Sequence, residues 1–278
     1  MRLNFHKLHG AANDFVVVDE RAAGPVDWAA VAPRLCDRHR GVGADGVLLV
    51  GPSTGADLRM RLFNADGSEA EMCGNGIRCT AKFALDAGLT DRLDLAWETG
   101  AGIVRTEVLE RDGVHARVRV DMGQPRLRPE EIPVTVEGDS VQGRRFSVNG
   151  GSLDLTCVSM GNPHAVAFVD SVAAFPLERL GPEVERHPDF PQRTNFEVVE
   201  VIAPDHLRMR VWERGVGETQ ACGTGACAVA VAGRLVAGTP ERVDVDLPGG
   251  RLEVSWRPGA AVMMTGPAET VYAGEVEV

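Results

Sequence analysis

Short runs in which apolar and polar residues alternate, or in which β-branched residues dominate, recur along the 278-residue chain. Such runs are typical of β-strands, and the glycine, proline, aspartate and asparagine residues between them are typical of turns. The pattern therefore predicts a strand-rich protein. The strands that we predict include residues 14–19, 57–63 and 114–122 in the first part of the chain and 165–170, 196–202 and 207–213 in the second.

Two stretches have a helical pattern instead, residues 76–88 and residues 225–238. Each follows a Cys-Gly pair and ends on a glycine, Gly88 or Gly238, which is the residue favoured at a helix C-terminus. The second stretch is apolar or small on nearly all sides, so we expect it to be buried inside its domain. A sheet wrapped around a central helix fits this combination of elements.

The chain repeats itself. Residues 61–79 align without gaps to residues 210–228 at a shift of 149, which is 222 minus 73. A weaker similarity pairs residues 10–19 with residues 161–170 and sets Asn13 opposite His164. Two homologous halves follow from this self-similarity. The identical pairs of the longer match are Arg61/Arg210, Glu69/Glu218, Cys73/Cys222, Gly74/Gly223 and Gly76/Gly225.

These patterns predict an α+β fold of two pseudo-symmetric domains, each a mostly antiparallel or mixed β-sheet or barrel wrapped around a central buried helix. We expect the active site in the cleft between the domains. The proline-rich stretch from residue 123 to 138 lacks helical periodicity and is the candidate crossing point. The first domain would then be residues 1–122 and the second 123–266, with 267–278 returning to the first domain as an edge strand.

Composition narrows the range of partners. The formal charge is −11, the sequence pI is about 5.1, and only 5% of residues are aromatic, so neither a basic patch nor a stacking surface for nucleic acid is expected. The N-terminal stretch meets charged and turn residues before any apolar run becomes long enough for a signal peptide or a membrane span. A cytoplasmic protein that binds a small molecule is the expectation.

Six cysteines are present and no CxxC pair occurs, so we expect free thiols and no metal site. Cys73 and Cys222 each precede a predicted helix, where the helix dipole and unpaired N–H groups lower a thiol pKa. The glycines after them let a ligand approach the backbone, which makes an anion site. A lone cysteine there is more often structural, but its repetition favours a reactive pair. We assign the remaining four to the core: Cys36, Cys79, Cys157 and Cys227.

Two thiols that flank one carboxylate are the arrangement that a two-base racemase or epimerase requires. One thiolate would remove the proton α to the carboxylate, and the other thiol would deliver a proton to the opposite face. Backbone N–H groups at both helix starts would stabilise the negative charge that develops on the carboxylate. No cofactor is needed for this chemistry.

At these residues the sequence resembles diaminopimelate epimerase, over essentially the whole chain. The segments that carry the resemblance are "HGAANDFVVVD", "FNADGSEAEMCGNGIRC", "GNPHAV", "RTNFEVV" and "ERGVGETQACGTGACA". The resemblance implies a pyridoxal-independent epimerase that interconverts LL- and meso-2,6-diaminopimelate in lysine and cell-wall precursor biosynthesis. It also implies a homodimer, with Tyr272 near the dimer contact.

The resemblance assigns roles residue by residue. Cys73 and Cys222 would be the base and the acid, exchanging roles with the direction of the reaction. Glu213 would accept a hydrogen bond from the substrate ammonium, and His164 and Glu213 would tune the thiol pKa values. The reacting carboxylate would be held by Gly74, Asn75, Gly223 and Thr224, and the distal amino-acid end by Asn64, Asn162, Asn195 and Arg214, with Asn13 close by. Each asparagine has a turn role as its alternative, which is the usual role of asparagine beside glycine or proline.

Two positions depart from the family pattern: Ala12 replaces a glycine and Gly46 replaces a glutamine. The first puts a loop conformation in question, and the second removes one possible substrate contact, so Gly46 is left out of the site. A proline or hydroxyproline racemase or epimerase is the nearest alternative enzyme, although its ring substrate has no second amino-acid end to engage Arg214. A non-catalytic amino-acid-binding or thiol redox-sensing protein is the alternative from another class.

Overall fold

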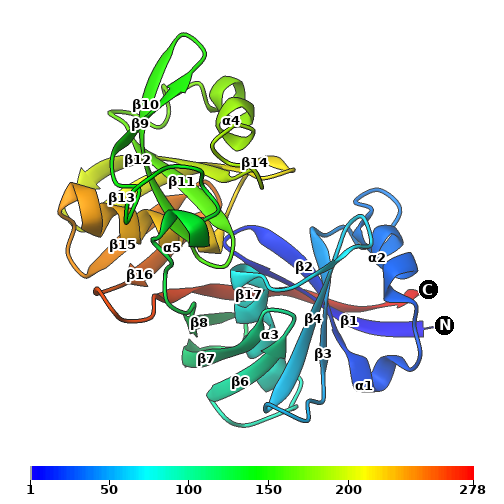
Figure 1. Ribbon diagram of the computed structural model, residues 1–278. Helices are drawn as coiled ribbons and strands as arrows, with labels where there is room; N and C mark the ends of the chain where they lie inside the picture. Colours follow the sequence, from blue (N-terminus) through cyan, green and yellow to red (C-terminus); the bar gives the residue numbers. More distant parts are fainter. Residues whose placement is uncertain (1) are drawn as a thin grey trace. The chain divides into compact units, whose positions relative to one another are not determined.

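A computed structural model describes residues 2–278, and the chain divides into two compact units (Figure 1). Unit 1 comprises the described residues up to Asp121 together with Thr265–Val278, and unit 2 comprises Met122–Met264. The α+β class predicted from the strand and helix patterns is confirmed.

The elements of unit 1 form a closed ring of strands around one helix. They are β1 (Arg2–Gly10), β2 (Asn13–Asp19), α1 (Glu20–Ala23), α2 (Trp28–Cys36), β3 (Gly46–Gly51), β4 (Leu58–Asn64), β5 (Glu69–Ala70), α3 (Gly74–Asp86), β6 (Asp94–Thr99), β7 (Gly102–Arg111), β8 (His115–Asp121) and most of β17 (Met263–Glu277). The strands pair in the order β17-β1-β2-β3-β4-β6-β7-β8, and β8 closes the ring by pairing with β17. The returning strand β17 thus has partners on both sides and is not an edge strand.

Helix α3 occupies the inside of this ring, in contact with β1, β2, β3, β4, β7 and β8 (Figure 1). Every residue from Gly74 to Leu85 is buried. The helix ends at Asp86, and Gly88 adopts the left-handed conformation, with φ of +65°, that was expected of a C-terminal glycine. Because the ring fixes the helix on every side, the position of its first turn is fixed too.

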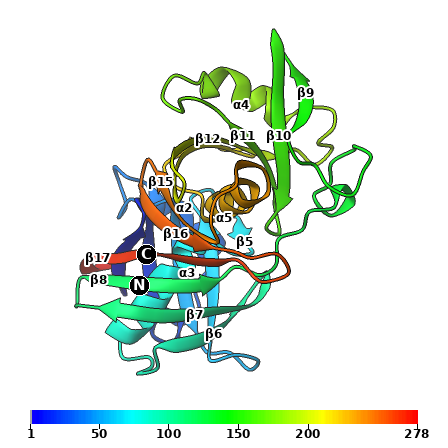
Figure 2. The same ribbon diagram turned by 90° about the vertical axis from the view of Figure 1, so that its left-hand side faces the viewer.

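Unit 2 has a similar succession of elements, with one helix where unit 1 has two and with additional elements at its start. Its elements are η1 (Pro129–Glu131), β9 (Arg144–Val148), β10 (Gly151–Ser159), β11 (Pro163–Phe168), α4 (Leu177–Glu185), β12 (Asn195–Ala203), β13 (His206–Glu213), β14 (Gly217–Thr219), α5 (Gly223–Ala232), the π-helical turn η2 (Gly233–Ala237), β15 (Arg242–Leu247) and β16 (Gly250–Ser255). The sheet runs β10-β11-β12-β13-β15-β16 and curves around α5, which contacts all six of these strands (Figure 2).

The topology of the two units confirms the internal repeat. In unit 1 the pairs β2/β3 and β4/β6 are parallel, and in unit 2 the pairs β11/β12 and β13/β15 are parallel. The central helix lies in the connection between the second parallel pair in both units, α3 between β4 and β6 and α5 between β13 and β15. Both sheets are therefore mixed, as predicted, since each parallel pair needs a crossover connection that a hairpin cannot supply.

The strand registers correct one detail of the repeat. Phe15 of β2 pairs with Gly46, and His164 of β11 pairs with Asn195. Since 195 minus 46 is 149, the residue that corresponds to His164 is Phe15. The predicted match of Asn13 with His164 is wrong by two residues, because the weaker similarity was aligned at a shift of 151; Asn13 corresponds to Asn162.

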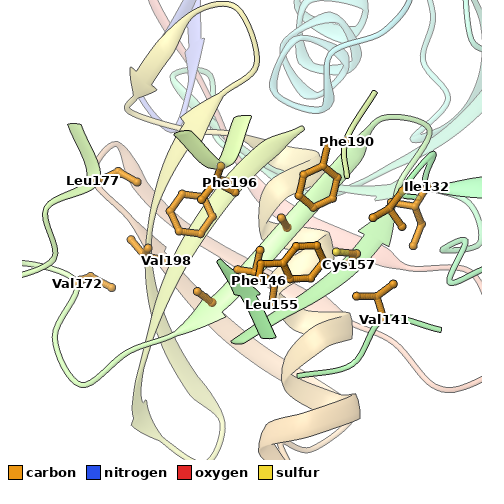
Figure 3. Close-up of a cluster of buried hydrophobic side chains, with 14 residues drawn as sticks. Ile132, Val141, Phe146, Leu155, Cys157, Val172, Leu177, Phe190, Phe196 and Val198 are labelled. Atoms are coloured by element: carbon orange, nitrogen blue, oxygen red, sulfur yellow. The ribbon is translucent and has the colours of Figure 1, made fainter. Parts of the chain in front are cut away.

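Alternation along β12 separates an apolar face from a polar one. Phe196 and Val198 point into an apolar cluster that also includes Phe146, Leu177 and Phe190 (Figure 3). Successive side chains of a strand point to opposite faces, so Glu197 lies on the face toward α5. A Cβ built on Gly225 of α5 would lie 2.9 Å from Glu197 Oε1, which confirms this placement.

Candidate active site

Cys73 is the N-cap residue of α3, with extended backbone angles (φ −139°, ψ 119°). Its sulfur accepts a hydrogen bond from the Gly76 N–H at 3.4 Å. Glycine at position 76 allows close packing, because a Cβ there would lie 3.1 Å from Leu48 Cδ2 and 3.4 Å from Cys73 Cβ. The first turn of α3 thus packs closely against Leu48, and the Cys73 sulfur lies at the start of the helix.

Asn13 contacts the Cys73 thiol from the start of β2. The sulfur lies 3.6 Å from Asn13 Oδ1, and Asn75 Nδ2 donates to the same oxygen at 3.3 Å. The amide orientation of Asn13 is set on its other side, where Nδ2 donates to Asp45 Oδ2 at 2.7 Å. A carboxylate only accepts, so Asp45 forces the Asn13 oxygen toward the thiol. Sequence reasoning missed Asp45, and only a contact across 32 residues of chain reveals its role.

Arg78 supports the first turn of α3 from inside the ring. Its guanidinium is fully buried and donates to Gly74 O at 2.9 Å, to Asn75 Oδ1 at 3.0 Å and to Pro267 O at 3.0 Å. Two of the expected substrate-binding residues, Gly74 and Asn75, are therefore fixed by this one side chain. The sequence signal for it was an arginine in the first turns of a predicted buried helix.

Cys222 is the N-cap residue of α5 and is only 6% exposed. Burial raises the pKa of its thiol well above the usual value, and the carboxylates of Glu213 and Glu197 raise it further. Hydrogen bonds from Thr224 and from the Gly225 N–H oppose this increase without cancelling it. The lowered pKa expected at a helix start is therefore not found at Cys222, because desolvation and two neighbouring carboxyl groups outweigh the helix dipole.

Glu213 lies at the end of β13, beside Cys222. Burial raises its pKa above the usual 4.5, and hydrogen bonds from Thr219 and Cys222 only partly oppose this. The nearby Glu197 also raises the pKa of Glu213, whereas His164 lowers it. A protonated carboxyl group beside a protonated thiol is thus the state that burial favours.

His164 and Asn162 connect this region to the helix start. The fully buried His164 places Nδ1 2.6 Å from Glu197 Oε1 and Nε2 3.0 Å from Asn162 Oδ1. Asn162 Nδ2 in turn donates to Thr224 Oγ1 at 3.3 Å, and that oxygen lies 3.5 Å from Cys222 Sγ. Four predicted site residues of unit 2 therefore belong to one hydrogen-bonded chain: His164, Asn162, Thr224 and Cys222. Glu197 was missed, although a carboxylate at a buried position of a strand is a recognisable signal.

Asn195 and Arg214 form a second polar group of unit 2. Asn195 Oδ1 accepts from the backbone N–H of Arg214 at 2.9 Å, while its Nδ2 donates to Pro163 O at 2.9 Å. The buried Glu185 accepts from the next N–H, that of Gly215, at 3.0 Å. Asn195 thus holds the backbone that carries Arg214, whose guanidinium donates to Gln192 O at 3.1 Å.

Asn64 ends β4 in unit 1. Its Nδ2 donates to Ser68 Oγ at 2.9 Å, and its backbone N–H donates to Ser68 O at 2.8 Å. The side chain therefore stabilises the turn between β4 and β5, as the turn alternative for asparagine predicts.

The two departures from the family pattern have clear structural settings. Ala12 has φ of 63°, the left-handed conformation that favours glycine, so the loop keeps the shape that a glycine would give it. Gly46 starts β3, where a Cβ would lie 2.9 Å from Phe63 O and 3.0 Å from Leu62 Cδ1. Only glycine suits this strand start without a shift of its neighbours.

Within residues 2–278, no group of three or more histidine, cysteine, aspartate or glutamate side chains is arranged to hold a metal ion. No helix in the described part of the chain is long and apolar enough to span a bilayer.

Two units of one fold, each with a cysteine at the start of its central helix, define an architecture that several solved structures share. A hydroxyproline epimerase from Agrobacterium vitis superposes with a TM-score of 0.71 at 16% identity, covering 99% of this chain and 92% of that one. A PhzF-family phenazine biosynthesis protein from Bacillus anthracis gives 0.72 at 18% identity, with both chains covered completely. Likeness at these identities concerns the fold.

The family itself is shown by sequence. The diaminopimelate epimerase family model matches residues 5–128 and 156–271. The diaminopimelate epimerases of Pelotomaculum thermopropionicum and of a Cyanothece species are 49% and 52% identical to this chain, over 98% and 99% of both chains in each comparison. The chain belongs to the diaminopimelate epimerase family, which confirms the resemblance seen in its motifs.

Proposed function

We propose that this protein interconverts LL- and meso-2,6-diaminopimelate. Relatives named diaminopimelate epimerase match the chain at about half of all positions and over nearly its full length. The observation that carries the proposal is the equivalence of Cys73 and Cys222, each the N-cap residue of the central helix in its own unit.

Both thiols act on one α carbon in this proposal. One of them, as thiolate, takes the α hydrogen as a proton and becomes a thiol, and the electron pair of the broken C–H bond stays on the substrate as a carbanion. The other thiol gives its proton to the opposite face of that carbon and becomes a thiolate. The backbone N–H groups at the starts of α3 and α5, from Gly74 and Asn75 and from Gly223 and Thr224, bind the carboxylate on which the charge develops.

The raised pKa of Cys222 supports a division of labour between the thiols. Burial and the Glu213 carboxyl group favour its protonated form, which is the form that donates. Glu213 and His164 tune this preference, and Glu213 accepts a hydrogen bond from the substrate ammonium. In the proposed resting state, Cys222 is the acid.

The distal amino-acid end of the substrate requires its own binding groups, because it carries a second carboxylate and a second ammonium. Arg214 offers a guanidinium fork for the carboxylate, on a backbone that Asn195 holds in place. Asn64, Asn162 and Asn13 add amide groups that donate and accept. A substrate without this second end leaves Arg214 without a partner, which favours diaminopimelate over proline.

The biological setting belongs to the same proposal. We expect a cytoplasmic enzyme of lysine and cell-wall precursor biosynthesis that acts as a homodimer. Tyr272 and Val271 on β17 are 44% and 56% exposed, and the Tyr272 ring packs edge-on against Phe5 at 5.8 Å. An exposed aromatic on a rigid strand supports a contact between subunits there.

Incubation with LL-diaminopimelate in heavy water tests the activity. The expected result is formation of the meso isomer with deuterium at the α carbon. Cys73→Ala and Cys222→Ala should each reduce kcat by a factor on the order of 10³, whereas Cys79→Ala and Cys227→Ala, on the same two helices, retain it. Turnover of proline without turnover of diaminopimelate would identify the alternative racemase, and binding without exchange would identify a non-catalytic binding protein.

A further inference from the structure

A buried pair of ionisable side chains lies directly beneath the Cys222 thiol. His164 and Glu197 are both fully buried, with Nδ1 and Oε1 2.6 Å apart. A Cβ built on Gly225 would lie 2.9 Å from Glu197 Oε1 and 3.3 Å from Cys222 Sγ. Glu197 and the Cys222 thiol therefore both lie against Gly225 in the first turn of α5.

The fold does not require this pair. The corresponding positions of unit 1, 149 residues earlier, are Phe15 and Leu48, which are 2% and 0% exposed. Leu48 lies against Gly76 just as Glu197 lies against Gly225. One scaffold thus packs an apolar pair under one thiol and an ionisable pair under the other, although burying ionisable groups costs free energy. The pair in unit 2 therefore calls for an explanation in the chemistry of Cys222.

The hydrogen bonds fix how many protons the pair holds. His164 Nε2 faces Asn162 Oδ1 at 3.0 Å, and a carbonyl oxygen only accepts, so Nε2 carries a hydrogen. The 2.6 Å contact between Nδ1 and Oε1 holds a second proton. Two protons make the pair of His164 and Glu197 neutral overall, which is the least costly state for a buried pair. The other oxygen of Glu197, Oε2, has no hydrogen-bond partner among residues 2–278.

This proton arrangement sets the direction of donation along the hydrogen-bonded chain from His164 through Asn162 and Thr224 to Cys222. Nε2–H donates to Asn162, and Asn162 Nδ2 donates to Thr224 Oγ1 at 3.3 Å. The Thr224 oxygen then accepts on one side, which allows its own hydrogen to point to Cys222 Sγ, 3.5 Å away. Donation to sulfur stabilises the thiolate, which Cys222 must form in one direction of the proposed reaction.

We infer that Glu197 is a positioning residue that fixes the direction of this chain, so that Thr224 presents its hydroxyl hydrogen to Cys222. The inference rests on the proposed role of Cys222. The other ionisable group that faces the thiol is Glu213 on β13, which opposes ionisation. The Thr224 hydrogen and the Gly225 N–H are the groups that oppose this effect.

The first test uses the wild-type protein and needs no substitution of His164 or Glu197. In the ¹⁵N spectrum of the full-length labelled protein, His164 Nε2 should appear protonated at neutral pH. An unprotonated Nε2 would mean that the chain runs the other way, from the thiol toward the histidine, and would overturn the inference.

The second test measures the rate at which iodoacetamide alkylates Cys222, mapped by mass spectrometry, with Cys73 in the same molecules as the internal reference. Glu197→Gln can still donate to Nδ1 and keep the hydrogen on Nε2, so its rate should stay within about twofold of wild type. The double variant His164→Phe/Glu197→Leu copies the unit 1 pair and removes the donor to Asn162. It should alkylate Cys222 about tenfold more slowly while Cys73 is unaffected.

Glu200→Gln, on the same strand, is the matched control and should leave both rates unchanged. The apolar pair of the double variant is one that the same scaffold already packs in unit 1, and its thermal melting establishes that it folds. If Glu197→Gln slows Cys222 as much as the double variant does, or if Cys73 slows in parallel, the role of Glu197 is only structural. Both tests are made without substrate, so they stand apart from a failure of the proposed epimerase activity.

Discussion

Arg78 and Pro267 are 189 residues apart in the sequence, yet Arg78 Nε donates to Pro267 O at 3.0 Å. This bond joins the helix that begins at Cys73 to the strand that brings the C-terminal residues back to unit 1. The same guanidinium holds Gly74 and Asn75 at the helix start. The geometry around the first thiol therefore depends on the chain end.

Arg78→Met should lower the free energy of unfolding by about 3 kcal/mol, because three buried acceptors lose a charged donor. Urea denaturation measures this loss, with the slope of the unfolding free energy against urea concentration the same in both proteins. Arg257→Met, at an exposed position, is the control and should change stability by no more than about 0.5 kcal/mol. An equal loss in both variants would show that the buried bonds of Arg78 are unimportant.

Ala12→Gly should stabilise the protein by about 0.5–1 kcal/mol. Ala12 has φ of 63°, which costs a residue with a Cβ about 1–2 kcal/mol. Glycine removes this cost, and its greater conformational freedom in the unfolded chain offsets only part of the stabilisation. Ala11→Gly is the control, because Ala11 has φ of 54° but is buried and would lose its methyl contacts. Thermal denaturation should show a higher Tm for the first variant alone; equal values for both would contradict backbone strain as the cause.

Glu213→Gln should become more stable relative to wild type as the pH rises. The folded pKa of Glu213 is raised by burial, so its contribution to stability is complete below the unfolded value near 4.5 and is lost as the pH rises through the folded value. Glutamine cannot ionise and escapes this loss. Melting temperatures at about pH 4 and about pH 8 measure the difference between the two proteins.

Glu183→Gln provides a control of opposite sign for that experiment. Hydrogen bonding from Asn149 lowers the pKa of Glu183, so its contribution is present above the unfolded value and is lost as the pH falls. The two variants should therefore diverge from wild type in opposite directions as the pH rises. Parallel behaviour would contradict the raised pKa of Glu213.

Arg214→Lys should raise KM for diaminopimelate by about tenfold or more while kcat changes much less, since lysine cannot form the two parallel bonds of a guanidinium with a carboxylate. Steady-state kinetics separate the two constants. Arg193→Lys, in the neighbouring loop with a half-exposed side chain, is the control and should change neither. A loss confined to kcat would place Arg214 at the reacting carbon instead of the distal end.

The duplicated architecture and the equivalent positions of the two cysteines were predictable from sequence because their signals are local. A gapless match between residues 61–79 and 210–228 requires no knowledge of contacts, and Cys73 and Cys222 stand immediately before helical patterns that end on glycine. Helix starts, turns and strand alternation depend on neighbouring residues, so the chain alone specifies them. The family motifs extended the prediction from sequence to the residues expected to bind substrate.

The tertiary structure decided what surrounds each thiol. Asp45, Arg78 and Glu197 act through contacts between distant segments, and no local pattern reveals which polar groups meet across a sheet or around a buried helix. Burial also reversed one expectation, since a helix start lowers a thiol pKa but the desolvated site beside Glu213 raises that of Cys222. Sequence determined that two equivalent thiols exist, and packing determined that their surroundings differ, because burial and charge are properties of the assembled core.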